Sequence, residues 1–374
     1  MRRCFIVIVG LILGLCVASA QSKKGVATKA AHATAPEQKF KAIWEPVPFS
    51  KDIAFRAMAC TGPETCWLAG DKSTILHTVD GGRTWTVQLG GDPEAADEDL
   101  AEIYFLDATH GWVMTERNRI LATTDGSSWA ELGKVPATSS GLWFISPQTG
   151  WVTDRSDSQS QSHLNRSDDG GRTWKRGYPC SVDTVIDGLP RKLGCMVRKT
   201  QFVSGSVGYI GGGAPINMGT DMAAISKTMD GGATWANSII PATKDRVEGV
   251  HFWSEKDGLV LLGSGQTFWT ADGGATWSGS TNPPPWRSHY AAAGGTLLVG
   301  ISENGRQIGY SFDGGRNFTS RMLGAPARVW AVTFPDATHG YFAGEHGMVY
   351  RYRVVPADYM SQGMISAAAP SPAR

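Results

Sequence analysis

Residues 228–235 read TMDGGATW, and this stretch decides the fold because it recurs along the chain. An Asp-Gly-Gly step between two β-prone runs is typical of a hairpin turn, in which Gly supplies a positive φ and Asp binds backbone N–H groups ahead of it. The Thr and Trp that follow begin the next strand. Full or degenerate copies of this turn centre on six aspartates, to which we assign a structural role: Asp80, Asp125, Asp169, Asp230, Asp272 and Asp313.

The spacing of these turns predicts the architecture. The six aspartates lie 45, 44, 61, 42 and 41 residues apart. In one unit, short β-prone runs at 102–105, 111–114 and 120–123 precede the turn, and the strand at the Trp makes a fourth. Four-stranded units repeated at this period are typical of a β-propeller. We therefore expect an all-β chain that forms a seven-bladed β-propeller of four-stranded antiparallel blades.

The two ends of the repeat region predict how the ring closes. The last unit, 329–354, has three strands and lacks the turn and the final strand. A strand at 42–48, ahead of the first blade, is expected to supply the missing one, which removes the exposed edge of an open ring. The expected order is a signal peptide at 1–20, a mobile linker at 21–41, the propeller at 42–355 with an insertion at 175–198, and a disordered tail at 356–374.

The first twenty residues predict export. Arg2 and Arg3 precede an apolar run at 5–17, and Ala18-Ser19-Ala20 places small residues where a signal peptidase cleaves. We expect cleavage after Ala20 and a periplasmic or secreted protein. A lipoprotein signal at Cys16 is the alternative, although Leu15 stands where a small residue is needed. No later stretch is long and apolar enough to cross a bilayer, so no integral membrane segment is expected after cleavage.

Four cysteines lie outside the signal, and four cysteines allow three connectivities. Proximity in sequence favours one disulfide between Cys60 and Cys66 and another between Cys180 and Cys195. Export to an oxidising compartment agrees with this pairing. Four buried free thiols are the alternative.

Composition excludes several function classes. The formal charge is +1, from 35 Lys and Arg against 34 Asp and Glu, so no bulk charge concentrates a polyanion, and we expect no nucleic-acid partner. The residues show no nucleophile elbow, phosphate loop or paired Cys-x-x-Cys zinc pattern. We expect no catalytic residue, no cofactor and no metal.

A longer motif surrounds the turn. Residues 105–112 read Phe-x-Asp-x-x-His-Gly-Trp, and residues 334–341 repeat this order with Tyr in the last position. The turn resembles the Asp-box, or BNR, repeat of sialidases and sortilin-type receptors. The whole unit resembles the photosystem II stability/assembly factor family over about residues 42–354. That resemblance implies an exported seven-bladed propeller with an arginine-bearing face that binds a client membrane protein.

The start of each innermost strand is the expected binding region, because these ends line one mouth of the central channel. Alignment of the repeats places several charged residues there, and Arg is well suited to bind carboxylates. Separate solvated arginines or salt bridges between blades are the alternative. The expected client-binding residues are Arg56, Arg198, Arg246, Glu248 and Arg328.

These observations lead to one functional hypothesis and two rivals. The hypothesis is an exported, monomeric and non-catalytic propeller that binds a protein client, by resemblance an assembly factor for a membrane complex. A carbohydrate-active propeller is the first rival, although a glycosidase needs two carboxylates across a cleft. A plain scaffold is the second.

Overall fold

The computed structural model describes residues 40–357 except 48, 96, 137–138, 155–162, 178–179, 218–219, 242, 282–289, 294–296 and 303. The expected signal peptide at 1–20, nearly all of the linker at 21–41 and nearly all of the tail at 356–374 therefore lie outside the described residues. The described residues form strands, turns and loops, and they contain no helix that is long and apolar enough to cross a membrane.

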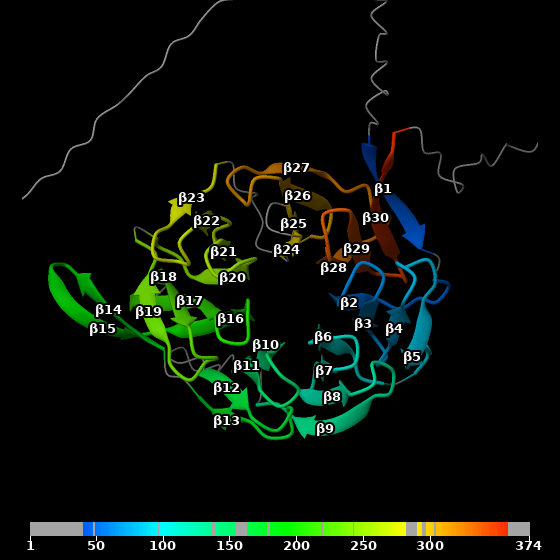
Figure 1. Ribbon diagram of the computed structural model, residues 1–374, viewed down its shortest axis with the longest axis horizontal. Coiled ribbons are helices and arrows are strands. Elements are labelled where there is room, and N and C mark those ends of the chain that lie inside the picture. The colour runs from blue at the N-terminus through cyan, green and yellow to red at the C-terminus, as the bar shows by residue number, and fades with distance from the viewer. Residues whose placement is uncertain are drawn as a thin grey trace, which may run out of the picture. The chain divides into compact units, whose positions relative to one another are not determined.

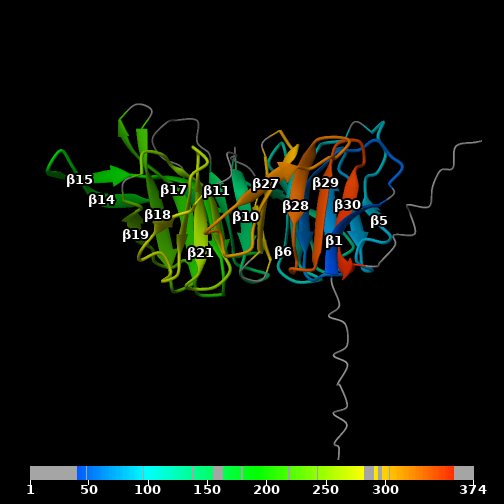
Figure 2. The ribbon, with the colours of Figure 1, turned by 90° about the horizontal axis from the view of Figure 1, so that it is seen from above.

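Seven four-stranded antiparallel sheets stand in a ring around a central opening, which confirms the expected fold class (Figures 1 and 2). An eighth sheet is a two-stranded hairpin outside the ring. The first three blades are β2 (Phe55–Cys60), β3 (Cys66–Gly70), β4 (Ile75–Thr78) and β5 (Thr86–Leu89); β6 (Leu100–Phe105), β7 (Gly111–Thr115), β8 (Arg119–Thr123) and β9 (Ala130–Lys134); and β10 (Ser139–Phe144), β11 (Gly150–Asp154), β12 (His163–Ser167) and β13 (Lys175–Arg176).

The hairpin separates the third blade from the fourth. It consists of β14 (Ser181–Ile186) and β15 (Leu189–Gly194). The next three blades are β16 (Met196–Phe202), β17 (Gly208–Asn217), β18 (Thr220–Thr228) and β19 (Ala236–Ile239); β20 (Val247–Phe252), β21 (Gly258–Leu262), β22 (Thr267–Thr270) and β23 (Ser278–Gly279); and β24 (Tyr290–Ala293), β25 (Leu297–Ile301), β26 (Gln307–Ser311) and β27 (Thr319–Met322).

The seventh blade joins the two ends of the propeller. It contains β28 (Val329–Thr333), β29 (His339–Gly344), β30 (Val349–Pro356) and, as its outermost strand, β1 (Phe40–Val47). β1 pairs with β30 over its whole length, from Phe40 opposite Pro356 to Val47 opposite Val349. The expected closure by an N-terminal strand is thus confirmed, with the strand beginning two residues before the predicted position.

A Phe ring packed on a Gly backbone holds the inner strands of a blade together. Phe105 of β6 lies opposite Gly111 of β7, and a methyl group at Gly111 would stand 2.5 Å from the ring. Trp67 of the preceding blade stacks on the same ring at 3.6 Å. Phe144, Phe202 and Phe252 face a Gly in the same register. The motif therefore requires Gly because only a hydrogen leaves room for the ring.

Both expected disulfides are present, which confirms the pairing. Cys60 and Cys66 are bonded, with Cα atoms 4.0 Å apart, and they occupy in blade one the register position that Phe and Gly occupy in blades two to five. Cys180 and Cys195 are bonded at the base of the hairpin, with Cα atoms 5.1 Å apart.

The aspartates bind their own turns. Asp230 accepts hydrogen bonds from the Thr234 backbone N–H at 2.8 Å and from the Thr228 hydroxyl at 2.8 Å. The Thr234 hydroxyl donates to the second carboxylate oxygen at 2.5 Å. These bonds, with that of the Thr234 hydroxyl the strongest, lower the pKa of Asp230 to about 2. Similar bonds recur at Asp80, Asp169, Asp272 and Asp313.

Candidate functional site

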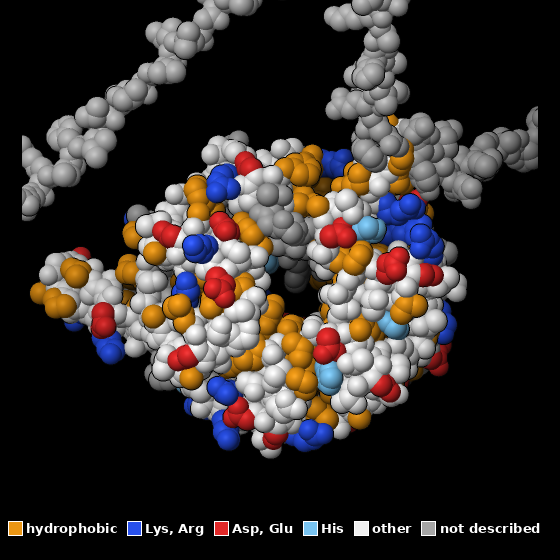
Figure 3. All heavy atoms as spheres, viewed as in Figure 1, with side chains coloured by type: hydrophobic (Ala, Val, Ile, Leu, Met, Phe, Trp, Pro, Cys, Tyr) orange, Lys and Arg blue, Asp and Glu red, His pale blue; other side chains and the backbone are white. Residues whose placement is uncertain are grey.

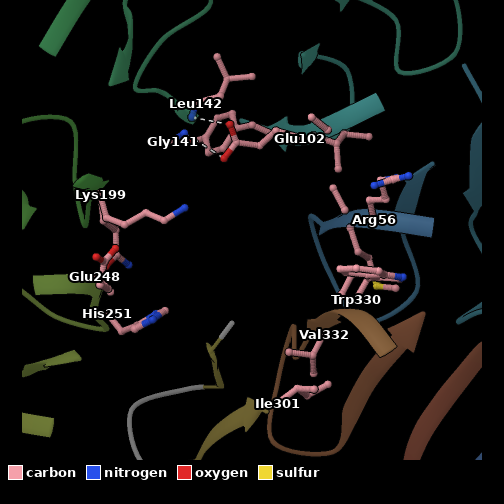
Figure 4. Close-up of a pocket in the computed structure, with 18 of the residues that line it drawn as sticks. Arg56, Glu102, Gly141, Leu142, Lys199, Glu248, His251, Ile301, Trp330 and Val332 are labelled. Atoms are coloured by element: carbon pink, nitrogen blue, oxygen red, sulfur yellow. Dashed lines mark hydrogen bonds between the residues drawn. The ribbon is translucent and has the colours of Figure 1, made fainter. Parts of the chain in front are cut away.

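The innermost strands surround a central cavity of about 660 Å³ (Figures 3 and 4). Its wall is shared among all seven blades, since each contributes at least one lining residue. Charged side chains gather on this wall together with aromatic ones. They are Arg56, Glu102, Lys199, Glu248, His251, Arg328, Tyr104, Trp143 and Trp330.

A β-bulge near the start of the innermost strand aims the side chains at this wall. In six of the seven blades the register between the first and second strands shifts at this point. A bulge leaves an extra residue unpaired, bends the strand and increases its twist. The residues at the shift are Arg56, Ala101, Gly141 with Leu142, Arg198, Glu248 and Trp330. The equivalent Ser288 of blade six lies outside the described residues.

Blades seven and one place two of the predicted arginines around one indole. The Cζ atom of Arg328 lies 3.8 Å from the centre of the Trp330 ring, and that of Arg56 lies 6.0 Å away. Among aromatic side chains, Trp offers the best face for a cation–π contact. Figure 4 shows Arg56 and Trp330 side by side on the cavity wall.

Carboxylates surround Arg56, as the salt-bridge alternative foresaw. Its guanidinium contacts Asp71 at 2.6 Å, Asp99 at 3.3 Å and Glu116 at 3.4 Å. The hydrogen bond to Asp71, with the charges nearby, raises the pKa of Arg56. Asp99 and Glu116 belong to the next blade, so Arg56 links blades one and two. Its charge is therefore largely balanced within the ring.

The other predicted residues lie in blades four and five. Arg246 contacts Glu248 at 2.5 Å and Asp221 of the neighbouring blade at 3.6 Å. Glu248 lines the cavity, whereas Arg198 and Arg246 are not among the described residues that line it. The structure thus gathers Arg56 and Arg328 near Trp330, and Arg246 with Glu248, in two separate groups.

Two charged residues of the wall were not among the predicted binding residues. Lys199 extends into the cavity in Figure 4, and no carboxylate of the described chain forms an ion pair with it. Glu102 accepts hydrogen bonds at 3.1 Å from the backbone N–H groups of Gly141 and Leu142, which are the bulged residues of the next blade. Lys199 stands three positions before Phe202 and Glu102 three before Phe105, whereas the predicted Arg198 and Glu248 stand four before Phe202 and Phe252.

The chemistry available at the wall is recognition of charge and aromatic surface. The two carboxylates that line the cavity are already bound, Glu102 by backbone N–H groups and Glu248 by Arg246. The described residues contain no group of three or more His, Cys, Asp and Glu that could hold a metal ion. Among the described residues, the cavity therefore offers cations and an indole ring to a ligand.

The Asp turns lie on the face of the propeller opposite to the one that carries the bulges. Strands alternate in direction within a blade, so the turn after the third strand stands at the end where the first strand finishes. The turn aspartates are consequently remote from the wall residues described above.

Comparison with known proteins supports the family resemblance over the first part of the chain. Residues 36–175 match the family model described as photosynthesis system II assembly factor YCF48. The expected family resemblance is confirmed. The photosystem II assembly protein Ycf48 of Synechococcus sp. (strain JA-2-3B'a(2-13)) is 33% identical over 128 residues, which are 33% of this chain and 35% of that protein. The alignment thus spans about a third of the length of this relative.

Solved structures share the fold over most of the chain. YCF48 from Cyanidioschyzon merolae has a TM-score of 0.58 at 15% identity, covering 83% of this chain and 98% of its own. YCF48 bound to D1 peptide has a TM-score of 0.56 at 19% identity, covering 85% and 98%. A GH74 xyloglucanase from Xanthomonas campestris has a TM-score of 0.55 at 15% identity, covering 83% and 53%. At these identities the likenesses show the fold alone.

Proposed function

We propose that this chain is an exported, non-catalytic propeller that binds a segment of a protein client at the channel mouth and assists assembly of a membrane complex. The match of its first three blades to the assembly-factor family carries this proposal. A related propeller has been solved with D1 peptide bound, and this supports a peptide as the kind of ligand. The predicted signal peptide supports an exported or periplasmic location, and we propose a monomer.

The cavity wall supports a binding role with particular residues. Arg328 stacks on Trp330, and Lys199 reaches the cavity without an ion pair among the described residues. These cations suit an acidic or carboxylate-ended segment, because charge-assisted hydrogen bonds are stronger than neutral ones. Arg56 instead has three carboxylates around it, so we assign it the task of joining two blades.

Binding of a labelled D1 peptide, followed by fluorescence anisotropy, tests the proposal. Arg328→Glu should weaken binding at least about tenfold, since loss of a charge-assisted contact costs on the order of 1.5–3 kcal/mol. Arg172→Glu is the matched control, because Arg172 is exposed in a turn at the opposite end of the ring.

If both variants lost peptide affinity equally, the assignment of the binding site to the channel mouth would be wrong. Failure of the unaltered protein to bind the peptide would contradict the client itself. Hydrolysis of a glycan by the unaltered protein, abolished by Glu248→Gln, would favour the carbohydrate-active alternative.

A further inference from the structure

The insertion between blades three and four forms an arm that the proposed function does not use. β14 and β15 pair from Ser181 opposite Gly194 to Ile186 opposite Leu189. Asp187 and Gly188 make the connecting two-residue turn with φ values of 51° and 78°, which is the geometry of a tight hairpin. Figure 1 shows this hairpin projecting outward from the ring beside β18 and β19, far from the central opening.

The direction of the backbone groups in this arm follows from two hydrogen bonds. The Cys195 N–H donates to the Cys180 carbonyl at 3.0 Å, so this pair bonds across the hairpin. Bonded and non-bonded pairs alternate along an antiparallel ladder. Ser181, Asp183 and Val185 therefore turn their N–H and C=O groups outward. The side chain of Asn237 in β19 donates to the Ser181 carbonyl at 2.6 Å, which agrees with this direction.

The outer edge of β14 beyond Ser181 is open. No hydrogen bond within the described chain reaches the backbone of Asp183 or Val185 from outside the hairpin. Val185 is 66% exposed and Leu189, near it across the turn, is 56% exposed. A lone two-stranded ribbon is marginally stable, and a third strand stabilises it.

The two edges of the arm differ in how well they resist pairing. The edge of β15 carries Pro190, which has no N–H, followed by Arg191 and Lys192. Proline and basic residues are the devices by which edge strands avoid joining other chains. β14 reads Ser-Val-Asp-Thr-Val-Ile, rich in β-branched residues and free of Pro and basic residues. One edge is thus protected and the other is suited to accept a strand.

We infer that the outer edge of β14, Asp183–Ile186, binds an extended segment of a partner protein as an added strand. Backbone hydrogen bonds to Asp183 and Val185 would supply the pairing, as in other cases of strand addition. Asp183 lies in register with Lys192 across the hairpin, so the carboxylate of Asp187 at the turn is the one that favours a segment carrying Lys or Arg beside β-branched residues. This site lies outside the channel mouth and provides a second contact with a protein.

The same arm is poorly suited to enter a lipid bilayer. Asp187 occupies the turn itself and would be the first side chain to reach the hydrocarbon. A charged side chain there is costly. The apolar residues Val185 and Leu189 flank this carboxylate, so a protein surface with a basic residue at its rim accommodates the tip and a bilayer does not.

Two proline variants of the full-length mature protein test the inference. Val185→Pro removes one outward N–H from β14, and Lys192→Pro removes one outward N–H from β15, while both leave the bonded pairs of the hairpin in place. The probe is a fluorescein-labelled peptide of about six residues that alternates Val with Thr and ends in Lys. Val185→Pro should weaken its binding at least about tenfold, and Lys192→Pro should change it less than about twofold.

Two further measurements distinguish binding at β14 from binding at the channel mouth: amide hydrogen exchange, and peptide binding by a variant of the channel wall. The peptide should slow exchange at the Asp183 and Val185 amides, and Arg328→Glu should leave peptide binding unchanged. Equal loss in both proline variants, or no binding to the unaltered protein, would overturn the inference. The inference would also be overturned if the unaltered protein formed a dimer that Val185→Pro abolished, or if it bound phosphatidylglycerol vesicles and Leu189→Asp abolished that binding. Because Val185 is remote from the channel, its variants should bind D1 peptide normally, so either proposal can fail alone.

Discussion

Replacing Gly111 with Ala introduces a methyl group where the structure has no room for one. The new Cβ atom would lie 2.5 Å from two carbons of the Phe105 ring. The ring cannot retreat, because Trp67 stacks on it with the ring centroids 3.6 Å apart and Trp129 packs against it in a T-shaped arrangement with the centroids 5.8 Å apart. Overpacking of this kind costs about 1–3 kcal/mol.

This cost converts into a measurable fall in melting temperature. An unfolding entropy of about 2.1 cal/mol/K per residue over about 315 residues gives roughly 0.7 kcal/mol/K, so Tm should fall by about 1.5–4.5 °C. Differential scanning calorimetry at neutral pH measures it. Gly205→Ala is the matched control, since nothing lies within 4 Å of its added Cβ, and its Tm should hold or rise slightly.

A double-mutant cycle identifies the cause. Phe105→Ala alone should cost about 3–5 kcal/mol, and Gly111→Ala added to it should cost little more, because the clashing ring is gone. If Gly111→Ala proves as stable as Gly205→Ala, or if its cost persists without the ring, the steric account of the Phe-Gly motif is wrong.

Three further outcomes follow from the described contacts. Asp230→Asn should destabilise the protein at neutral pH and less so near pH 2. The folded pKa of about 2 lies below the ordinary 3.8, so the carboxylate stabilises the fold above about pH 4 and this contribution disappears on acidification. Urea unfolding at both pH values measures the difference in stability between variant and unaltered protein, and a difference that grows in acid contradicts the prediction. Cys180→Ser with Cys195→Ser should remove about 3 kcal/mol from the closed hairpin and speed trypsin cleavage at Arg191 and Lys192, with unchanged cleavage as the contrary result. Arg56→Ala should lower stability by up to about 1 kcal/mol because three carboxylates lose their common partner, whereas Arg172→Ala should leave Tm unchanged; equal values for the two would show that Arg56 does not join the blades.

The fold was predictable because its determinants are local and repeated. The Asp-Gly-Gly turn specifies a hairpin from its own residues, and this hairpin recurs at intervals of 41 to 45 residues, apart from one of 61, which is typical of a propeller. Ring closure by β1 followed from the absence of one strand at the far end. The disulfides followed from proximity along the chain, since both pairs close short loops.

The candidate site was less predictable because it depends on contacts between blades. Asp99 and Glu116 reach Arg56 from the next blade, and Asp221 reaches Arg246 from the preceding one. No pattern within one repeat indicates which arginine will meet a carboxylate there. Of the predicted arginines, Arg56 and Arg328 line the cavity among the described residues, whereas Arg198 and Arg246 do not. The carboxylates that pair with Arg56 and Arg246 come partly from neighbouring blades.

The bulge explains why Lys199 and Glu102 were not among the predicted binding residues. In a regular strand successive side chains point to opposite faces, so a position adjacent to a channel residue would face away. The register shift at Val197/Lys199 breaks this alternation and turns the residue after the bulge toward the cavity. The same shift beside Glu102 leaves its carboxylate free to bind the bulged backbone of the next blade. This irregularity recurs in six of the seven blades; it places residues such as Lys199 on the cavity wall and, through Glu102, joins neighbouring blades.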